Sequence, residues 1–405
     1  MEPTREQWTE LYQAAIRLKK QKPWQWMSMG QIFAITDPAD GVNYYCSVQS
    51  EDDLDYVQIL IGEDGLNRIM SLVESISQGA EYDDDEAADA SNGLASYMLN
   101  FDEHSLNCFF TDQEHLSQYE AEVLQNLELS FRGSKQWISF RHIQPGQLTE
   151  SVHDAEQVRI LTTVLEQVYS VCALEKKQRF IRDLFHDTTT TEVFRWFYAP
   201  QAKIWQGTFL ALESIMNKGT PVICSNQLDL LKIRRLKGSR RIYEFIRMYM
   251  PMPVEHHGRL FFPLTFLLVD MDNGMIVWNH IDTGDEGYEL RLIKKLSDFF
   301  LKEGYKPSRI LTADYVLYQI ASDFCDKSKI FLEFLNYTIT GDEILESFQE
   351  STRLTYEAME PTIMEMDKEK HLLSHMTRDD SEPPIQQPSQ QAKIIDFRTG
   401  RPVEQ

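Results

Sequence analysis

Carboxylates in the second half of the chain stand where apolar segments end. Asp270 follows the apolar run Leu260–Val269, and Asp314 follows the short segment Arg309–Ala313. Glu343 lies near the start of a predicted final helix. If the two apolar segments are adjacent strands of a mainly parallel sheet, these carboxylates could together hold two divalent ions, Mg²⁺ or Mn²⁺. That arrangement would suit phosphodiester cleavage.

Each aspartate also has a simpler structural interpretation. An aspartate at the end of a strand commonly shapes the next turn or caps the next helix, because its short side chain accepts hydrogen bonds from nearby backbone N–H groups. Asp270 precedes the turn sequence Asp272-Asn273-Gly274, and Asp314 precedes a predicted helix from Tyr315. The structural interpretation is the stronger one, and a metal-dependent nuclease, or a degenerate relative of one, is the alternative.

The predicted elements around these aspartates follow a definite order. A strand, a hairpin, a helix, a strand, a second helix, a strand and an acidic helix succeed one another. This order is similar to a reduced ribonuclease-H-like layout, in which clustered carboxylates hold two metals. One hairpin of the usual fold is missing, which weakens the nuclease alternative.

A basic run over residues 232–241 is the strongest positive cluster in the chain. A polyanion or an acidic partner could bind there, and we expect any nucleic-acid contact only at this run. Apolar residues are interleaved with the bases, which favours an amphipathic element whose charged side is solvated or paired with the protein's own acids. The bases are Lys232, Arg234, Arg235, Lys237, Arg240 and Arg241, of which Arg234, Arg235, Arg240 and Arg241 are the candidate anion ligands.

Motifs of nucleophilic, nucleotide-dependent and zinc-dependent enzymes are missing from the sequence. There is no GxSxG, no phosphate-binding loop of the GxxxxGK[ST] type, no GxGxxG and no HExxH. We therefore predict no cofactor, apart from Mg²⁺ or Mn²⁺ under the nuclease alternative. The balance favours a protein that is not an enzyme.

The composition bounds the class further. The chain has 405 residues, 42% of them hydrophobic and 25% charged, as in ordinary globular proteins. Its net charge of -23 disfavours general coating of nucleic acid. The five cysteines are widely spaced without a CxxC pair, which is typical of reduced thiols. No apolar run approaches the roughly 20 residues of a membrane span, so we expect a cytoplasmic protein with no membrane partner.

Periodicity and turn signals predict an α+β N-terminal domain over residues 1–150 and a linking helix over 151–185. An α/β domain with a mixed sheet follows over 186–360. Among the predicted strands are Leu94–Asn100 in the first domain, and Thr191–Ala199 and Ile204–Ala211 in the second.

The last part of the chain has a different composition. The segment over 376–405 contains the polar, proline-rich sequence SEPPIQQPSQQ, so we expect a flexible tail. A small apolar cluster near its end, within AKIIDFRTGRPVEQ, could dock on a protein partner by adding a strand or filling a groove. The tail over 392–405 is therefore a predicted partner contact.

The sequence contains a set of short stretches that together form a recognisable pattern: Pro23–Met27, Tyr45–Val48, Gly62–Leu66, Phe131–Gly133 with Trp137, Phe140-Arg141, Pro145-Gly146, Phe262-Pro263, and Asp270 with Gly274. This set resembles a group of uncharacterised bacterial proteins, chiefly from Firmicutes, whose two halves are domains of unknown function. The resemblance covers about Trp8 to Phe348 and implies a cytosolic bacterial protein, but it supplies no catalytic residues. The sequence departs from the pattern at Gln144 and Gln147-Leu148, where more aromatic residues are expected. Together these observations predict a non-enzymatic binding or interaction protein.

Overall fold

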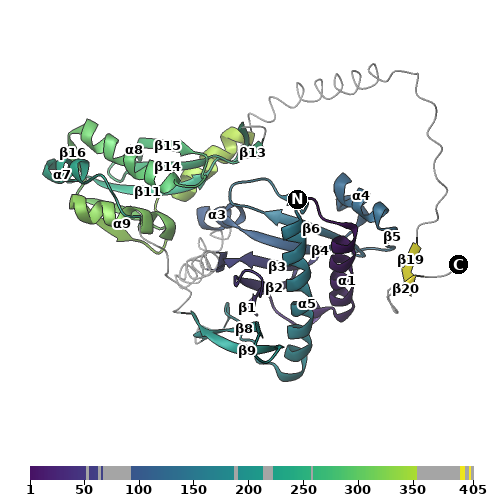
Figure 1. The fold of residues 1–405 in the computed structure, drawn as a ribbon. Coiled ribbons are helices and arrows are strands. Elements are labelled where there is room, and N and C mark those ends of the chain that lie inside the picture. Colours follow the sequence, from purple (N-terminus) through teal and green to yellow (C-terminus); the bar gives the residue numbers. More distant parts are fainter. Residues whose placement is uncertain are drawn as a thin grey trace, which may run out of the picture. The chain divides into compact units, whose positions relative to one another are not determined.

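The computed structural model divides into two compact units, which are described one at a time (Figure 1). Unit 1 comprises Met1–Val222 with Ala392–Gln405, and unit 2 comprises Ile223–Gln391. The structure describes residues 1–51, 54–62, 65–66, 93–186, 190–212, 222–256, 259–353, 393–396 and 401–402. Most of the predicted tail over 376–405 therefore lies outside the described residues.

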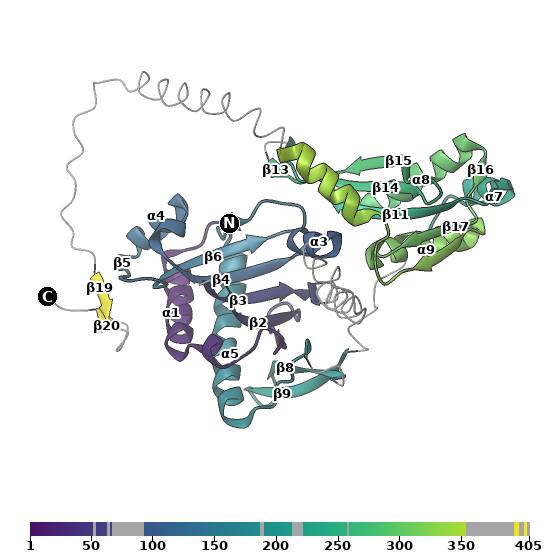
Figure 2. The same cartoon turned by 180° about the vertical axis from the view of Figure 1, so that it is seen from behind.

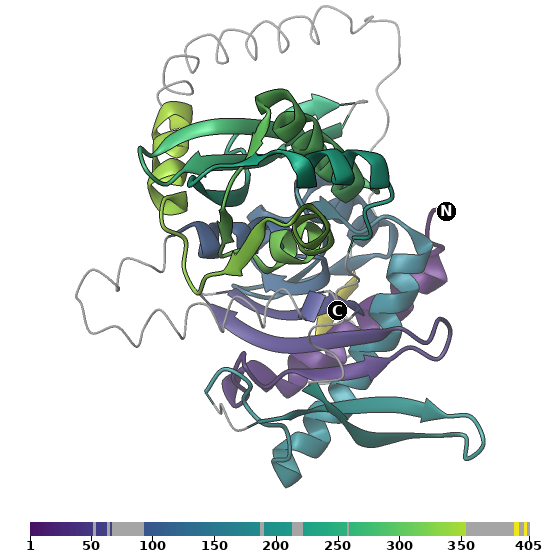
Figure 3. The ribbon, with the colours of Figure 1, turned by 90° about the vertical axis from the view of Figure 1, so that its left-hand side faces the viewer.

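Unit 1 is built on an eight-stranded sheet with the order β7-β6-β4-β3-β2-β1-β8-β9. Neighbouring strands are antiparallel except β1 and β8, which are parallel. Figure 3 shows β8 and β9 as a teal hairpin at one edge of this sheet. The strands are β1 (Phe33–Thr36), β2 (Asn43–Glu51), β3 (Leu54–Ile61), β4 (Ser105–Thr111), β6 (Trp137–Ile143), β7 (Glu150–Ser151), β8 (Glu192–Ala199) and β9 (Ile204–Ala211).

Two long helices, α1 (Arg5–Gln21) and α5 (Ala155–Gln178), lie side by side on one face of the sheet (Figures 1 and 2). α1 begins with a capping box between Thr4 and Gln7. Its C-terminal cap is Lys22, which has a left-handed φ of 51° and is followed by Pro23. The apolar faces of both helices pack with the inward side chains of the strands in one core. This packing, repeated every three to four residues, is what holds the helices on the sheet.

Shorter elements complete unit 1: α3 (Leu94–Asp102), α4 (Gln118–Asn126), β5 (Leu129–Ser130), and the 3-10 turns η1 (Pro23–Gln25) and η3 (Gln113–His115). The prediction of a strand over Leu94–Asn100 was wrong, because these residues form α3. In the chain's last part, β19 (Lys393–Asp396) pairs in parallel with β5 and antiparallel with β20 (Arg401–Pro402).

Unit 2 contains a five-stranded mixed sheet with the order β15-β14-β11-β17-β18. β14 is antiparallel to both of its neighbours, β15 and β11, whereas β11, β17 and β18 are parallel to one another. The helix over 341–353 crosses the sheet on one face, as Figure 2 shows in yellow-green. The elements are α7 (Gln227–Arg235), β10 (Lys237–Gly238), β11 (Ile242–Tyr249), β12 (Val254–His256), β13 (Arg259–Phe261), β14 (Leu264–Asp270), β15 (Met275–Asp282), α8 (Tyr288–Glu303), β16 (Tyr305–Lys306), β17 (Arg309–Thr312), α9 (Tyr315–Ser328) and β18 (Phe331–Phe334).

The units divide the chain at a different place from the predicted domains. The segments over 191–199 and 204–211 form the predicted strands, but they complete the sheet of unit 1 because β8 pairs in parallel with β1. The predicted linking helix is α5, and its side chains belong to the unit 1 core. The boundary therefore falls at Val222 rather than near residue 185.

The helices in the described part of the chain are all too short or too polar to cross a membrane.

Candidate functional site

The two strand-end aspartates of unit 2 lie at opposite ends of the sheet. The prediction that their strands are neighbours was wrong, because β11 lies between β14 and β17 and runs antiparallel to β14. Asp270 is opposite Tyr243 on β11, whereas the Asp314 carboxylate contacts Arg247 on the same strand. Four residues of strand span about 13 Å. That spacing is too great for the aspartates to share a pair of metal ions that lie about 4 Å apart.

Asp270 shapes the turn between β14 and β15. Its carboxylate accepts a hydrogen bond from the Asp272 N–H (3.0 Å), and its carbonyl accepts one from the Gly274 N–H (2.8 Å). Gly274 has a φ of 68°, the left-handed conformation that this turn requires. The carboxylate is also 3.7 Å from the Arg241 guanidinium. Asp270 therefore has the structural role that its turn sequence suggests.

Asp314 caps the start of α9. One carboxylate oxygen accepts from the Leu317 N–H (2.9 Å), and the other pairs with Arg247 Nε (2.7 Å). The Arg247 side chain is 4% exposed, so this ion pair is largely shielded from water. The third candidate, Glu343, is exposed on the helix over 341–353. Among the described residues, no group of three or more histidine, cysteine, aspartate or glutamate side chains is placed to hold a metal ion.

A buried glutamate that the sequence analysis missed holds the loop before the final helix. Glu244, on the central strand β11, is fully buried. One carboxylate oxygen accepts from the Thr338 hydroxyl and the Ile339 N–H, both at 2.7 Å. The other accepts from the Thr340 N–H (2.8 Å) and hydroxyl (2.7 Å). These four bonds join the centre of the sheet to the helix over 341–353, so the role of Glu244 is structural.

The basic run forms one surface at the C-terminal end of α7. Asn226 caps the start of this helix by accepting from the Asp229 N–H. Leu230 and Ile233 are its buried side chains, so the charged residues face outward. The chain then continues as β10 and the loop leading into β11. The side chains of Lys232, Arg234, Arg235, Lys237, Arg240 and Arg241 are all exposed, and we call this set the basic surface.

The backbone beneath the basic surface is firmly held. β10 pairs in parallel with β16. The Ser239 N–H donates to the Lys306 carbonyl (2.9 Å), and the Ser308 N–H donates to the Arg241 carbonyl (3.0 Å). The Lys306 ammonium donates to the carbonyls of Arg234 (3.2 Å) and Ser328 (2.6 Å), which lie at the ends of α7 and α9. The exposed cations therefore project from a fixed frame.

Among the described residues, most cations of the basic surface have no acidic partner. Lys232 pairs with Asp229 (2.8 Å), and Arg241 lies near Asp270 and stacks on the Tyr305 ring at 5.2 Å. Within the described part of the chain, none of the remaining four bases, Arg234, Arg235, Lys237 and Arg240, pairs with a carboxylate. Burial, reinforced by the Arg234 charge, lowers the pKa of Lys306. An anion at this surface would relieve the crowding of positive charge.

Exposed apolar side chains lie beside these cations. Leu228 and Leu231 project from α7 with 71% and 48% of their surface exposed. Their spacing of three residues places them on one face of the helix, and Arg235 follows Leu231 at helical spacing on that same face. The surface therefore combines cations with apolar area. Sequence analysis identified the bases, but it did not identify α7 or the exposure of the leucines.

Two family models match the chain. Residues 8–195 match a family described as Domain of unknown function (DUF7309). Residues 229–349 match a second one, described as Domain of unknown function (DUF6930). The chain thus carries two domains of unknown function, and the second contains the whole basic surface. No curated protein and no solved structure matches the chain.

Proposed function

We propose that the protein is a non-enzymatic binding protein whose basic surface receives an acidic segment of a protein partner. The observation that carries the proposal is the set of four exposed bases that have no acidic partner among the described residues and that project from a backbone held by hydrogen bonds. Because the backbone beneath these cations is already held, it loses little conformational freedom when the surface binds an anion, which favours affinity. Electrostatic attraction would also speed the encounter with an acidic partner.

The neighbouring leucines favour a protein over a nucleic acid. Leu228 and Leu231 offer apolar area that phosphates cannot use, whereas an acidic segment with apolar side chains could cover both parts of the surface. The charge around the basic surface also favours a protein partner. Outside the basic run, residues 223–353 include 19 acidic and 11 basic side chains. A long polyanion would therefore extend from the basic surface onto a net acidic one.

The catalytic alternative has weaker support. We propose that unit 2 has a ribonuclease-H-like layout, because three antiparallel strands are followed by two parallel ones and a helix precedes each of the latter. Metal-dependent cleavage would need carboxylates gathered around Mg²⁺ or Mn²⁺. Asp314 instead pairs with Arg247, whose fixed positive charge opposes a cation at that place. The layout thus fits a degenerate, non-cleaving relative better than a nuclease.

The tail over 392–405 is proposed as a second partner contact. Its strand β19 lies between β20 and β5 of unit 1 in a three-stranded sheet, so the peptide already pairs as a strand. A partner that uses the tail would take the place of β5 in this pairing. A pull-down with the full chain and with a chain lacking residues 377–405 tests this contact. Equal recovery of the same partners by both chains would remove the tail from the proposal.

Binding at the basic surface is tested by fluorescence anisotropy with two labelled probes, a peptide of alternating glutamate and leucine and a single-stranded DNA of equal charge. Arg234→Gln, Arg235→Gln and Arg240→Gln combined should weaken peptide binding at least about tenfold. The matched control combines Lys294→Gln, Lys295→Gln and Lys302→Gln on α8, where exposed lysines are interspersed with acids. It removes the same charge and should change the dissociation constant less than about twofold.

A second pair of substitutions separates the two kinds of partner. Leu228→Ser with Leu231→Ser should weaken the peptide but leave DNA binding unchanged, because phosphates make no use of the apolar area. If the arginine triple variant and the lysine triple variant bound the peptide with equal affinity, the proposal would be contradicted. DNA binding that is tighter than peptide binding and insensitive to the leucine substitutions would assign the surface to nucleic acid.

A further inference from the structure

On the side away from α1 and α5, strands β3, β4 and β6 of unit 1 carry a row of polar side chains. Alternate residues of β3 and β4, such as Val57 and Cys108, enter the core beneath those helices. The residues between them point the other way. In the strand register, Gln58 lies opposite Asn107, which lies opposite Arg141 on β6. Three polar side chains therefore form a row across three neighbouring strands.

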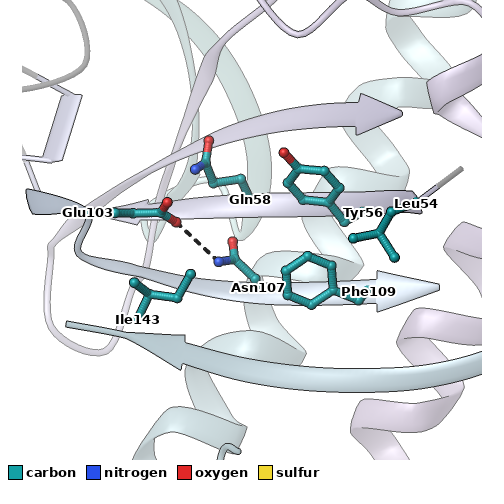
Figure 4. Close-up of a pocket in the computed structure, with 7 residues that line it drawn as sticks. All are labelled: Leu54, Tyr56, Gln58, Glu103, Asn107, Phe109 and Ile143. Atoms are coloured by element: carbon teal, nitrogen blue, oxygen red, sulfur yellow. Dashed lines mark hydrogen bonds between the residues drawn. The ribbon is translucent and has the colours of Figure 1, made fainter. Parts of the chain in front are cut away.

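A hollow of about 300 Å³ opens on this face (Figure 4). Its volume is at the lower end of the range for pockets that bind small molecules. The lining combines an aromatic pair, two amides, a carboxylate and aliphatic side chains. The lining residues are Leu54, Tyr56, Gln58, Glu103, Asn107, Phe109 and Ile143.

The amide of Asn107 leaves one hydrogen-bond acceptor unused in the hollow. Asn107 is 1% exposed. Its nitrogen donates to the Ser105 hydroxyl (2.8 Å) and to Glu103 Oε1 (3.2 Å), the bond drawn in Figure 4. Within the described part of the chain, its oxygen has no hydrogen-bond partner. A buried polar atom without a partner costs free energy and is rare in native proteins, so a donor from outside the chain is the simplest explanation.

The carboxylate of Glu103 supplies a negative charge beside this acceptor. Glu103 Oε1 accepts from both the Ser105 hydroxyl and the Asn107 amide. No described side chain donates to its other oxygen. Among the described residues that line the hollow there is no lysine or arginine. Around Asn107 and Glu103 the hollow therefore offers acceptors and negative charge, which matches a ligand that carries N–H groups and a positive charge.

The rest of the hollow is an aromatic and aliphatic wall. The rings of Tyr56 and Phe109 have centroids 5.1 Å apart and planes inclined by 32°. The Tyr56 hydroxyl donates a hydrogen bond to Gln49 Oε1 (2.5 Å), which fixes the orientation of the ring. Aromatic faces attract cations, and planar guanidinium groups stack on them particularly well.

We propose that this hollow binds a guanidinium group. Its N–H groups would donate to the Asn107 oxygen and to Glu103, and its plane would lie against Tyr56 and Phe109. The group could belong to a free small molecule or to an arginine side chain of a peptide. The proposal concerns unit 1 and is independent of the basic surface in unit 2, so either proposal can fail without the other.

Isothermal titration of the full chain with agmatine, with a blocked arginine peptide and with neutral N-butylurea tests the proposal. We expect agmatine or the peptide to bind and butylurea not to bind. Binding of the peptide alone identifies the source as an arginine side chain, whereas binding of agmatine identifies a small molecule. Failure of both cationic ligands to bind the folded chain at millimolar concentration, or equal binding of butylurea, would overturn the proposal.

Two substitutions locate the site. Glu103→Gln keeps an oxygen that can accept from Ser105 and Asn107 but removes the charge, so it should weaken the cationic ligand about tenfold or more. Phe109→Leu removes an aromatic face and should weaken it severalfold. The control is Glu114→Gln, whose side chain is 81% exposed and lies outside the hollow. Circular dichroism shows whether each variant is folded, and unchanged affinity in both folded test variants would refute this location.

Discussion

Two buried glutamates, one in each unit, perform the same structural task with different surroundings. Glu120 belongs to helix α4 of unit 1 and Glu244 to strand β11 of unit 2. Each of the two oxygens of each carboxylate accepts one hydrogen bond from a backbone N–H and one from a hydroxyl. Glu120 thereby joins the start of α4 to strand β6, and Glu244 joins β11 to the start of the helix over 341–353. Each bond set attaches a helix start to a sheet.

The difference between them is a cation. The Arg141 guanidinium lies 2.9 Å from Glu120 and also donates to Ser151 and to the His115 carbonyl. At Glu244 the four bonds described come from neutral groups. The comparison shows that a buried carboxylate needs a complete set of donors, whereas a counter-charge is optional.

The largest expected effect follows from removing the Glu244 carboxylate, because its whole set of donors then has no acceptor. Glu244→Ala should lower the free energy of unfolding of unit 2 by roughly 3–5 kcal/mol, because two backbone N–H groups lose their partners. Hydrogen exchange measured by mass spectrometry should show lost protection over 331–353. The control Glu343→Ala removes an exposed carboxylate and should cost less than about 0.5 kcal/mol. A cost for Glu244→Ala below about 1 kcal/mol would contradict the role assigned to this residue.

The next largest effect is the coupling between Glu120 and its counter-charge, Arg141, in unit 1. A double-mutant cycle with Glu120→Gln and Arg141→Met should give a coupling energy of about 1–2 kcal/mol in urea unfolding, because Glu120 is buried and Arg141 mostly so. The matched cycle on Arg309 and Glu333, an exposed pair at 2.8 Å, should give less than about 0.5 kcal/mol. Equal coupling in the two cycles would mean that burial adds nothing to the Glu120 pair.

These glutamates also explain where sequence analysis failed. Strand β11 contains Glu244 and Arg247, two charges that are buried because each has a partner. Their presence hides the apolar pattern of a central strand, so the segment looked like the continuation of an amphipathic basic element. Without β11, the aspartate-terminated strands were placed side by side. The error in the candidate site thus came from one missing strand.

Local signals succeeded where long-range pairing was not needed. The turn before Gly274 and the helix cap at Asp314 follow from residue types alone, and both were predicted as structural alternatives. The apolar segment over 94–100 was ambiguous, since a short apolar run fits a strand or a buried helix equally well. The placement of β8 beside β1 depends on a pairing between residues 161 positions apart, such as Phe33 and Phe194, for which the sequence has no local signal.

The smallest expected effect is on the pH dependence of the stability of unit 1, through His142. Burial, reinforced by His104 and His153, lowers the pKa of His142 from 6.5 to about 4. The folded state therefore keeps this ring neutral over a range in which the unfolded chain binds a proton. Stability from this residue is fully present above pH 6.5 and is lost as the pH falls toward 4.

His142→Gln should remove that part of the acid sensitivity. The fall in unfolding free energy of unit 1 between pH 7 and pH 4.5 should be smaller than in the wild type by about 1 kcal/mol, a value reduced for the partial exposure of the ring. Urea unfolding at both pH values measures the difference, and His115→Gln, at an exposed position, serves as the control. An equal fall in wild type and His142→Gln would show that the ring protonates as readily in the folded chain as in the unfolded one. The acid sensitivity of unit 1 would then have to arise at other groups.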